Sequence, residues 1–288
     1  MNANNNRMYS YYFLLPAGII YFVFFLFPTL MSFFYSMTWW TLTDWEFIGF
    51  ENFITFFESP SLRIGFRNTL FFAGTAVTGK VILGLLIAVF LTSKIRNKDM
   101  LRSIVFFPVL ISAIAVGATF GVLMHPTDGI INNGLNLIGL PSVDWLGNPN
   151  LAIFSVAFTD IWRGVGIATV IFIAGIMAIP GDYKEALKID GGNTFQEFRH
   201  IILPLSRPAM NTVIILALID GLRNFDLVWA MTGGGPGFSS DVLASIIYKQ
   251  YASGFYGLAT AGNVILFFFV ACIAFPVFKF INRKEVDL

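Results

Sequence analysis

Charged residues are scarce in this chain of 288 residues: only 12% are charged, whereas 56% are hydrophobic. An average soluble domain carries about 25% charged residues, so the composition predicts a protein of the lipid bilayer. The formal net charge is only +1. A charge balance this close to neutral argues against a basic surface for a phosphate backbone, so we expect no nucleic-acid partner.

Cysteine and histidine are also nearly absent. The single cysteine, Cys272, excludes an internal disulfide and any cysteine-based metal cluster. His125 and His200 are far apart and lack the spacing of metal ligands. The glycine-rich run at 232–237 lacks a following Gly-Lys-Ser/Thr, so it is not a nucleotide-binding loop. We therefore expect no metal site, no bound cofactor and no independent catalysis on this chain.

Long apolar runs are what the sequence has instead. Six stretches are long enough to cross about 30 Å of hydrocarbon as helices. They are Tyr11–Ser36, Thr69–Thr92, Ser103–Met124, Leu151–Ala178, Ala209–Met231 and Gly257–Ile281. The first exceeds a signal-peptide core in length, so we expect it to be a retained span. The predicted fold class is an all-α membrane protein with six transmembrane helices in contact with lipid.

Lysine and arginine are distributed unequally between the two sides of these spans. One side holds Arg7, Lys94, Arg96, Lys98, Arg102, Lys184, Lys188, Arg199, Arg207, Lys279, Arg283 and Lys284, and the other holds only Arg63, Arg67 and Lys249. Positively charged loops stay in the cytoplasm. We therefore expect both termini and the segment 179–208 to be cytoplasmic, in a multi-pass protein of the cell (inner) membrane. The turn-rich segment 126–150 would be external.

The segment between the fourth and fifth spans contains two helix signals. Asp182 and Glu185 predict the start of a short helix, and Gly191-Gly192 predicts its end. Thr194 and Glu197 predict a second capping box. The expected apolar stripe of the second helix is Phe195, Phe198 and Ile202, and Leu203-Pro204 is expected to end it. Two short helices with a glycine hinge suit docking to a soluble partner.

The spacing of this segment resembles the EAA loop of ABC importer permeases, E-A-A-x3-G-x9-I-x-L-P. The matching residues are Glu185, Ala186, Gly191, Ile201, Leu203 and Pro204, whereas Leu187 stands where the motif has a second alanine. In that family the loop forms a coupling helix that sits in a cleft of the ATPase subunit. The resemblance implies that these six residues couple the chain to the ATPase, with Glu185, Ala186 and Gly191 in contact with it.

The resemblance extends over nearly the whole chain and points to permeases for carbohydrate uptake. Further short signatures occur in the expected order at 50–53, 67–70, 102–108, 129–133, 145–146 and 223–237. The family implies the transmembrane domain of a type I ABC importer that works by alternating access. It also implies a second related permease, two ATPase subunits that hold ATP and Mg²⁺, an extracellular solute-binding protein and a sugar substrate.

The predicted spans and the family resemblance together divide the chain into three parts. Residues 1–68 hold an N-terminal tail, the first span and an outer loop. Residues 69–281 form the permease core, including the cytoplasmic coupling loop at 179–208, and residues 282–288 form a cytoplasmic tail.

Charged residues within the fourth and fifth spans are candidates for the solute pathway. Such a group costs about 2.5–3.5 kcal/mol at the bilayer centre, so it should face a cavity or a partner. The candidate set is Asp160, Trp162, Arg163, Gly164, Asp220, Arg223 and Asn224. One interpretation is a polar pocket for a sugar, with Trp162 as a stacking surface. The other is structural pairing of Asp160 with Arg223 and of Arg163 with Asp220. Lys80, in the second span, could line the pathway, snorkel or mark a shifted span boundary.

Three alternative functions remain open at this point. The same architecture could carry a polyol or glycerol phosphate, which Arg163 and Arg223 would suit. A passive channel or secondary carrier would need no ATPase. A membrane-embedded enzyme would need a catalytic set inside the bundle, for which Asp160 and Asp220 are the only candidates.

Overall fold

The computed structural model describes residues 11–41, 43–93 and 95–283. Arg7, Lys94, Lys284 and the tails 1–10 and 284–288 lie outside the described residues. The helices are α1 (Leu15–Tyr21), α2 (Phe27–Tyr35), α3 (Glu51–Glu58), α4 (Pro60–Thr92), α5 (Lys98–Phe106), α6 (Ala113–Leu123), α7 (Ile130–Leu137), α8 (Ala152–Met177), α9 (Gly181–Ile189), α10 (Thr194–Glu197), α11 (Leu203–Leu205), α12 (Arg207–Leu222), α13 (Asp226–Thr232), α14 (Leu243–Ala252) and α15 (Tyr256–Asn282). The strands are β1 (Thr38–Trp40) and β2 (Trp45–Phe47).

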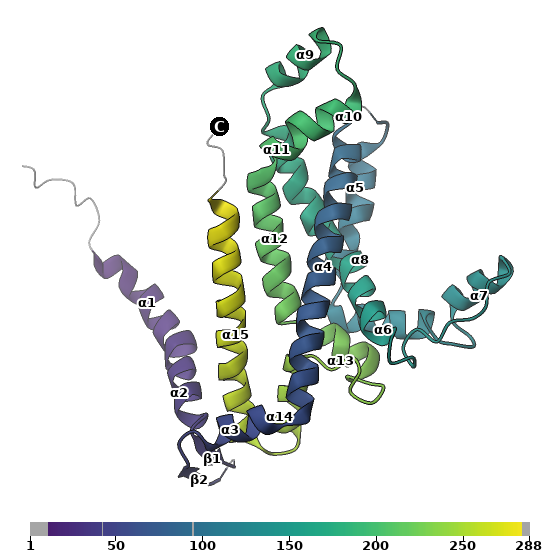
Figure 1. The fold of residues 1–288 in the computed structure, drawn as a ribbon. Helices are drawn as coiled ribbons and strands as arrows, with labels where there is room; N and C mark the ends of the chain where they lie inside the picture. The colour runs from purple at the N-terminus through teal and green to yellow at the C-terminus, as the bar shows by residue number, and fades with distance from the viewer. Residues whose placement is uncertain (1–10, 42, 94, 284–288) are drawn as a thin grey trace, which may run out of the picture. The chain divides into compact units, whose positions relative to one another are not determined.

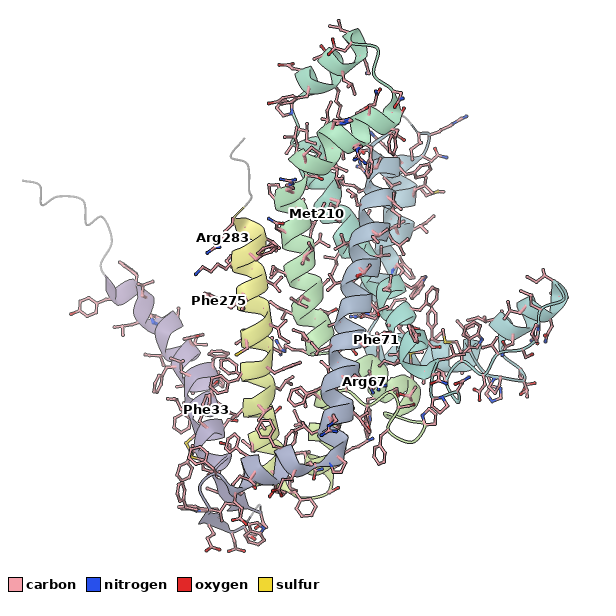
Figure 2. The ribbon with its side chains drawn as sticks, viewed as in Figure 1. Phe33, Arg67, Phe71, Met210, Phe275 and Arg283 are labelled. Carbon is pink, nitrogen blue, oxygen red and sulfur yellow. The ribbon has the colours of Figure 1, made fainter. Side chains whose placement is uncertain are left out.

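Among the described residues, four helical segments are long and apolar enough to cross a membrane unbroken. They are Tyr12–Tyr35, Pro60–Thr92, Ala152–Met177 and Tyr256–Asn282. They confirm the first, second, fourth and sixth expected spans, although the second begins at Pro60 and not at Thr69. Exposed aromatic side chains such as Phe71 and Phe275 project from these helices (Figure 2). In a bilayer such surfaces face lipid or another subunit.

The third expected span is bent and is not one straight helix. The segments Lys98–Leu110 and Ala113–Leu123 meet at 98°. Pro108 lies in a 3-10 turn, and Ile111 and Ser112 have extended ψ values of 137°. A proline cannot donate a helical hydrogen bond, and two successive extended residues end the helix. Hydropathy detects the apolar residues on both sides of this break but not the break.

The fifth expected span, Ala209–Met231, was wrong in extent. Helix α12 ends at Leu222, and α13 begins separately at Asp226. At its other end, α12 meets the segment Thr194–Leu205 at an angle of 66°. The helices separate where polar residues, Arg223 and Asn224, interrupt the apolar pattern. Gly233, with a φ of +57°, ends α13 in the left-handed conformation.

The described chain divides into two compact units. Within the described residues, the smaller unit comprises 11–59 and 247–265, and the larger comprises 60–246 and 266–283. In the smaller unit, β1 and β2 form an antiparallel hairpin that the all-helical expectation did not include. Its base is held by Asn52 of α3, whose Nδ2 donates to the carbonyl oxygens of Ser36 and Thr38 at 3.0 and 2.7 Å.

The larger unit is built around α4, which packs against both α8 and α12 (Figure 1). Small residues allow the close approach of α4 and α8: a Cβ added at Gly84 would lie 2.8 Å from the Cβ of Ala168. Two apolar clusters fill the interior. The first contains Phe72, Ala76, Val116, Phe120, Val156, Ala157, Leu227 and Val228, and the second contains Leu85, Ala88, Leu91, Ala168, Phe172, Ile173, Ile176, Ile202 and Val213. Lys80 of α4 and Asp160 of α8 come between the two clusters along the chain of each helix.

Candidate functional site

Lys80 is the centre of a charged cluster inside the larger unit. Its Nζ lies 2.7 Å from Oδ2 of Asp160 on α8 and 2.8 Å from Oδ2 of Asp220 on α12. The Lys80 side chain is 5% exposed, that of Asp160 is fully buried and that of Asp220 is 53% exposed. A buried ammonium is tolerated in an apolar bundle because opposite charges surround it. The Lys80 ammonium therefore links α4 to both α8 and α12 through ion pairs.

Gly164 makes room for the Lys80 side chain. A Cβ at position 164 would lie 2.5 Å from Cε and 2.9 Å from Nζ of Lys80. Asp160 and Gly164 are four residues apart on α8, so they share one face of that helix. The close approach at Gly164 is thus made by the lysine of a neighbouring helix.

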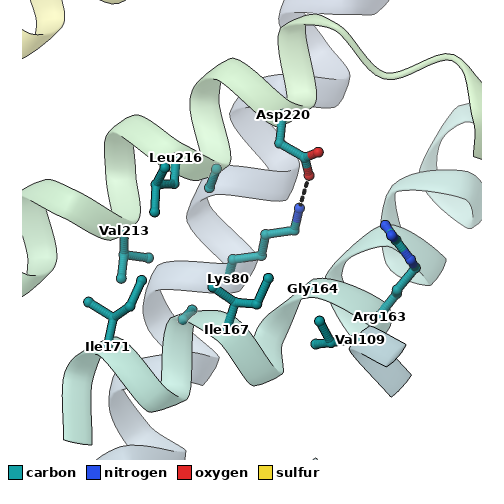
Figure 3. A pocket seen from close by; sticks show the side chains of 11 residues that line it. Lys80, Val109, Arg163, Gly164, Ile167, Ile171, Val213, Leu216 and Asp220 are labelled. Carbon is teal, nitrogen blue, oxygen red and sulfur yellow. Dashed lines mark hydrogen bonds and ion pairs between the residues drawn. The ribbon is translucent and has the colours of Figure 1, made fainter. Parts of the chain in front are cut away.

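Two adjoining cavities border this cluster. The first has a volume of about 240 Å³ and is lined by Lys80, Val109, Arg163, Gly164, Ile167, Ala168, Ile171, Val213, Leu216, Ala217 and Asp220 (Figure 3). The second, of about 440 Å³, is lined by Ala113, Arg163, Leu216, Ile219, Asp220, Arg223, Asn224, Phe225 and Asp226. Arg163, Leu216 and Asp220 belong to both linings, so the two cavities meet at these residues.

The structure brings five of the seven candidate pathway residues to the cavities: Arg163, Gly164, Asp220, Arg223 and Asn224. Among them, Oδ1 of Asn224 is buried without a hydrogen-bond partner in the described part of the chain. Arg163 donates from Nε to the carbonyl oxygen of Ile111 at 3.4 Å, which holds it at the bend between α5 and α6. The walls therefore present carboxylate, guanidinium and amide groups to the space.

The other two candidates lie elsewhere. Asp160 is fully buried behind Lys80. Trp162 packs against Phe120, with ring centroids 5.0 Å apart, and is absent from both cavity linings.

The alternative interpretation, in which these carboxylates pair with arginines, was wrong in its partners. Asp160 and Asp220 both pair with Lys80, in place of Arg223 and Arg163 respectively. Sequence reasoning had left three roles open for Lys80, and the structure places it in the lining of the first cavity. A lysine in mid-span requires a nearby acid, but only the packing of α4 on α8 and α12 shows which acids are near.

The segment predicted as a coupling loop forms a helix–hinge–helix. Helix α9 ends at Ile189, and Gly191, two residues further on, has a φ of +75°. The amides of Gly191 and Gly192 donate to the carbonyl oxygens of Lys188 and Leu187 at 3.1 and 2.8 Å. This is the hydrogen-bond pattern of a Schellman motif, which confirms the predicted helix end. In Figure 1, α9 lies beyond the end of the bundle formed by α4, α8 and α12.

The start signals of the two loop helices differ from those expected. Pro180 precedes α9, and no side-chain hydrogen bond caps it. The second capping box is formed by Asn193 and Gln196, one residue before the expected Thr194 and Glu197. Glu197 instead lies 3.6 Å from Nζ of Lys184, which links the two helices across the hinge.

The six residues predicted to couple the chain to an ATPase divide into an exposed and an internal group. Glu185, Ala186 and Gly191 are exposed on and after α9, whereas Ile201 is buried and Leu203 and Pro204 are half-buried. Phe198, Ile202 and Leu203 pack on the second apolar cluster. Phe195 is 66% exposed and does not join the expected stripe, because a π-helical turn at Phe198–Ile202 changes the helical register. Pro204 lies within the helical segment, which continues to Leu205.

No group of three or more histidine, cysteine, aspartate or glutamate side chains with the geometry of a metal site occurs among residues 11–41, 43–93 and 95–283. The arrangement offers polar contacts to a solute in the cavities and an exposed helix to a partner.

Comparison with known proteins gives consistent matches over most of the chain. Residues 80–284 match the model of the family described as binding-protein-dependent transport system inner membrane component. The chain is 31% identical to a trehalose/maltose transport system permease protein of Thermococcus litoralis, over 91% of this chain and 89% of that protein. It is 32% identical to a multiple sugar-binding transport system permease protein of Streptococcus mutans, over 98% of each.

Two crystal structures of bacterial transporters resemble the fold closely. One is an ABC transporter involved in the import of the acidic polysaccharide alginate, with a TM-score of 0.80 over 95% of this chain and 93% of that chain at 25% identity. The other is an alginate ABC transporter in complex with an alginate pentasaccharide-bound periplasmic protein, with a TM-score of 0.81 over 95% and 92% at 25% identity.

Proposed function

Since this chain belongs to the family of binding-protein-dependent transport system inner membrane components and is a permease subunit of an ABC importer for sugars, we propose that its solute is a neutral sugar or oligosaccharide. The solute would pass through the two cavities lined by Arg163, Asp220 and Arg223. The observation that supports a neutral solute is the balance of charge around the two cavities.

The charged groups at each cavity cancel formally. Around the first cavity, Lys80 and Arg163 balance Asp220 and the buried Asp160 behind it. Around the second, Arg163 and Arg223 balance Asp220 and Asp226. A site for an anion would carry an excess of cationic groups. A balanced wall of donors and acceptors suits the many hydroxyl groups of an uncharged sugar.

An anionic solute is the second candidate. Arg163 and Arg223 are at the cavities, and a relative with 25% identity takes part in the import of an acidic polysaccharide. An acidic sugar or a glycerol phosphate would bring its negative charge close to Asp220 and Asp226, which line the same cavity as these arginines.

We infer that ATP is hydrolysed outside this chain. The exposed part of α9 with Glu185, Ala186 and Gly191 would dock on an ATPase subunit, and ATP with Mg²⁺ would be held there. A second related permease would complete the pathway, two ATPase subunits would drive it, and an extracellular binding protein would deliver the solute. Both termini and residues 179–208 would face the cytoplasm. Movement of α9 would then be transmitted through Ile202 and Leu203 to the second apolar cluster.

Uptake by the reconstituted complex tests the proposed solute. Proteoliposomes containing both permeases and the ATPase subunits are supplied with the binding protein and with labelled maltose, trehalose, an alginate trisaccharide or glycerol 3-phosphate. We expect ATP-dependent uptake of a neutral sugar. Exclusive uptake of the anionic solutes would favour the second candidate, and uptake without ATP would contradict the importer mechanism.

A further inference from the structure

Lys80 forms ion pairs with two carboxylates that differ in their burial and in their access to the cavities. Asp160 is fully buried on α8, whereas the Asp220 side chain is 53% exposed and lines both cavities. Figure 3 shows the Lys80 side chain extending past Gly164 to Asp220 at the cavity. Asp160 is therefore an internal counter-ion, and Asp220 is the member of the cluster that a solute can meet.

The lysine side chain has little freedom to move. Its stem fills the space left by the missing Cβ of Gly164, and its Nζ is held by Asp160 at 2.7 Å. The same Nζ donates a hydrogen bond to Oδ2 of Asp220 at 2.8 Å. One oxygen of Asp220 is thus bound to a fixed donor, which orients the other.

We propose that Lys80 is a positioning residue for solute recognition: it fixes Asp220 at the cavity wall so that the second carboxylate oxygen accepts a hydrogen bond from a sugar hydroxyl. An acceptor held in place before binding loses less conformational entropy when the solute arrives. Asp160 balances the positive charge of Lys80, so that Asp220 remains a strong hydrogen-bond acceptor for the solute. This inference rests on the proposed function and assigns a role to the cluster within it.

The competing role for Lys80 is purely structural. A lysine that ties α4 to α8 and α12 would be needed for assembly even if Asp220 never touched a solute. Removing one member of a buried pair leaves an unpaired charge and destabilises the protein by itself. The test therefore replaces Lys80 and Asp160 together by uncharged residues of similar size, as Lys80→Met with Asp160→Asn, and leaves Asp220 unchanged.

Four complexes are compared with the unmodified one: the Lys80→Met/Asp160→Asn pair, Asp220→Asn, the triple variant that combines them, and Thr159→Val. Thr159 is fully buried beside Asp160, and its hydroxyl donates to the Ser155 carbonyl oxygen of its own helix at 3.0 Å. It is therefore the matched control for changing a buried polar residue of α8. For each complex we measure the assembled yield, the ATPase activity stimulated by loaded binding protein, and the sugar imported per ATP hydrolysed.

The probe is whichever of maltose and trehalose the unmodified complex imports faster. The pair and Asp220→Asn are each expected to lower sugar imported per ATP by about threefold to tenfold, the effect of one hydrogen bond. The loss of sugar imported per ATP in the triple variant should be no larger than in Asp220→Asn, because Lys80 acts through Asp220. Assembled yield and stimulated ATPase activity should stay near those of the Thr159→Val control.

The other outcomes distinguish a failure of the positioning role of Lys80 from a failure of the proposed function. Normal sugar per ATP in the Lys80→Met/Asp160→Asn pair, together with a loss in Asp220→Asn, would overturn the positioning role alone. A parallel fall of yield, ATPase activity and uptake in the pair would assign Lys80 to structure and also overturn it. Normal sugar per ATP in Asp220→Asn would also overturn the positioning role, because Asp220 would then have no part in recognising the solute. No uptake of either sugar by the unmodified complex would contradict the proposed function itself.

Discussion

The charged cluster depends on one small residue as much as on its ions. Lys80 reaches Asp160 and Asp220 only because Gly164 has no Cβ to block its stem. The residue types of this cluster are visible in the sequence, since mid-span charges must be paired. The partners are not visible, because Lys80, Arg163 and Arg223 are all possible cations until the helices are packed.

Replacing Gly164 by alanine should destabilise the assembled complex. The added methyl would collide with Cε of Lys80 and displace Nζ from a carboxylate, at a cost of about 1–3 kcal/mol for overpacking. The measurement is the melting temperature of the purified complex. Gly74→Ala in α4 is the matched control, because its new Cβ would meet no atom within 4 Å. Equal melting temperatures for the two variants would show that the lysine stem adjusts freely.

Among the elements, the predicted coupling loop has its glycine hinge where the sequence predicted it, whereas both helix starts differ from the prediction. Its glycine hinge has a strong local cause, since Gly191 adopts a φ of +75° that other residues avoid. The second helix start was displaced by one residue because Asn193 and Thr194 are both good N-caps. The bend at Ile111 follows a 3-10 turn, and the helix break after Leu222 falls at a few polar residues; an apolar run conceals both.

The ordered connection at 126–150 shows another limit of sequence reasoning. Asn132 is fully buried, and its Nδ2 donates to the carbonyl oxygens of His125, Pro126 and Val143. Its Oδ1 accepts from the amide of Val143 and from Nε1 of Trp145 at 3.0 Å each. The sequence indicated only a turn-rich segment, because one asparagine among several gives no sign of the contacts it makes.

Replacing Gly191 by alanine should weaken coupling between ATP hydrolysis and uptake. A left-handed backbone costs an L-residue about 1–2 kcal/mol, so the hinge would shift and reorient α9 against its partner. Gly181→Ala, at the start of the same helix, is the control because Gly181 has open space for a Cβ and no positive φ. Sugar imported per ATP should fall for Gly191→Ala and stay unchanged for Gly181→Ala. Similar values of sugar imported per ATP for both variants would show that the hinge at Gly191 is not needed for coupling.

At the scale of the whole molecule, composition and apolar runs predicted a helical membrane protein, and the motif spacing at residues 185–204 indicated its family. Four unbroken apolar helices and two bent pairs agree with that prediction. The direction of the chain across the membrane rests on lysine and arginine, three of which lie outside the described residues. The whole account requires that α9 faces the compartment in which ATP is hydrolysed.

Chemical labelling of single cysteines in intact cells tests that requirement most directly. In a Cys272→Ala background, Ile189→Cys reports on α9 and Leu137→Cys reports on α7, since these positions are 86% and 88% exposed. A membrane-impermeant maleimide is added before and after the cells are permeabilised. We predict that position 137 is labelled in intact cells and position 189 only after permeabilisation. Labelling of position 189 from outside intact cells would contradict the account.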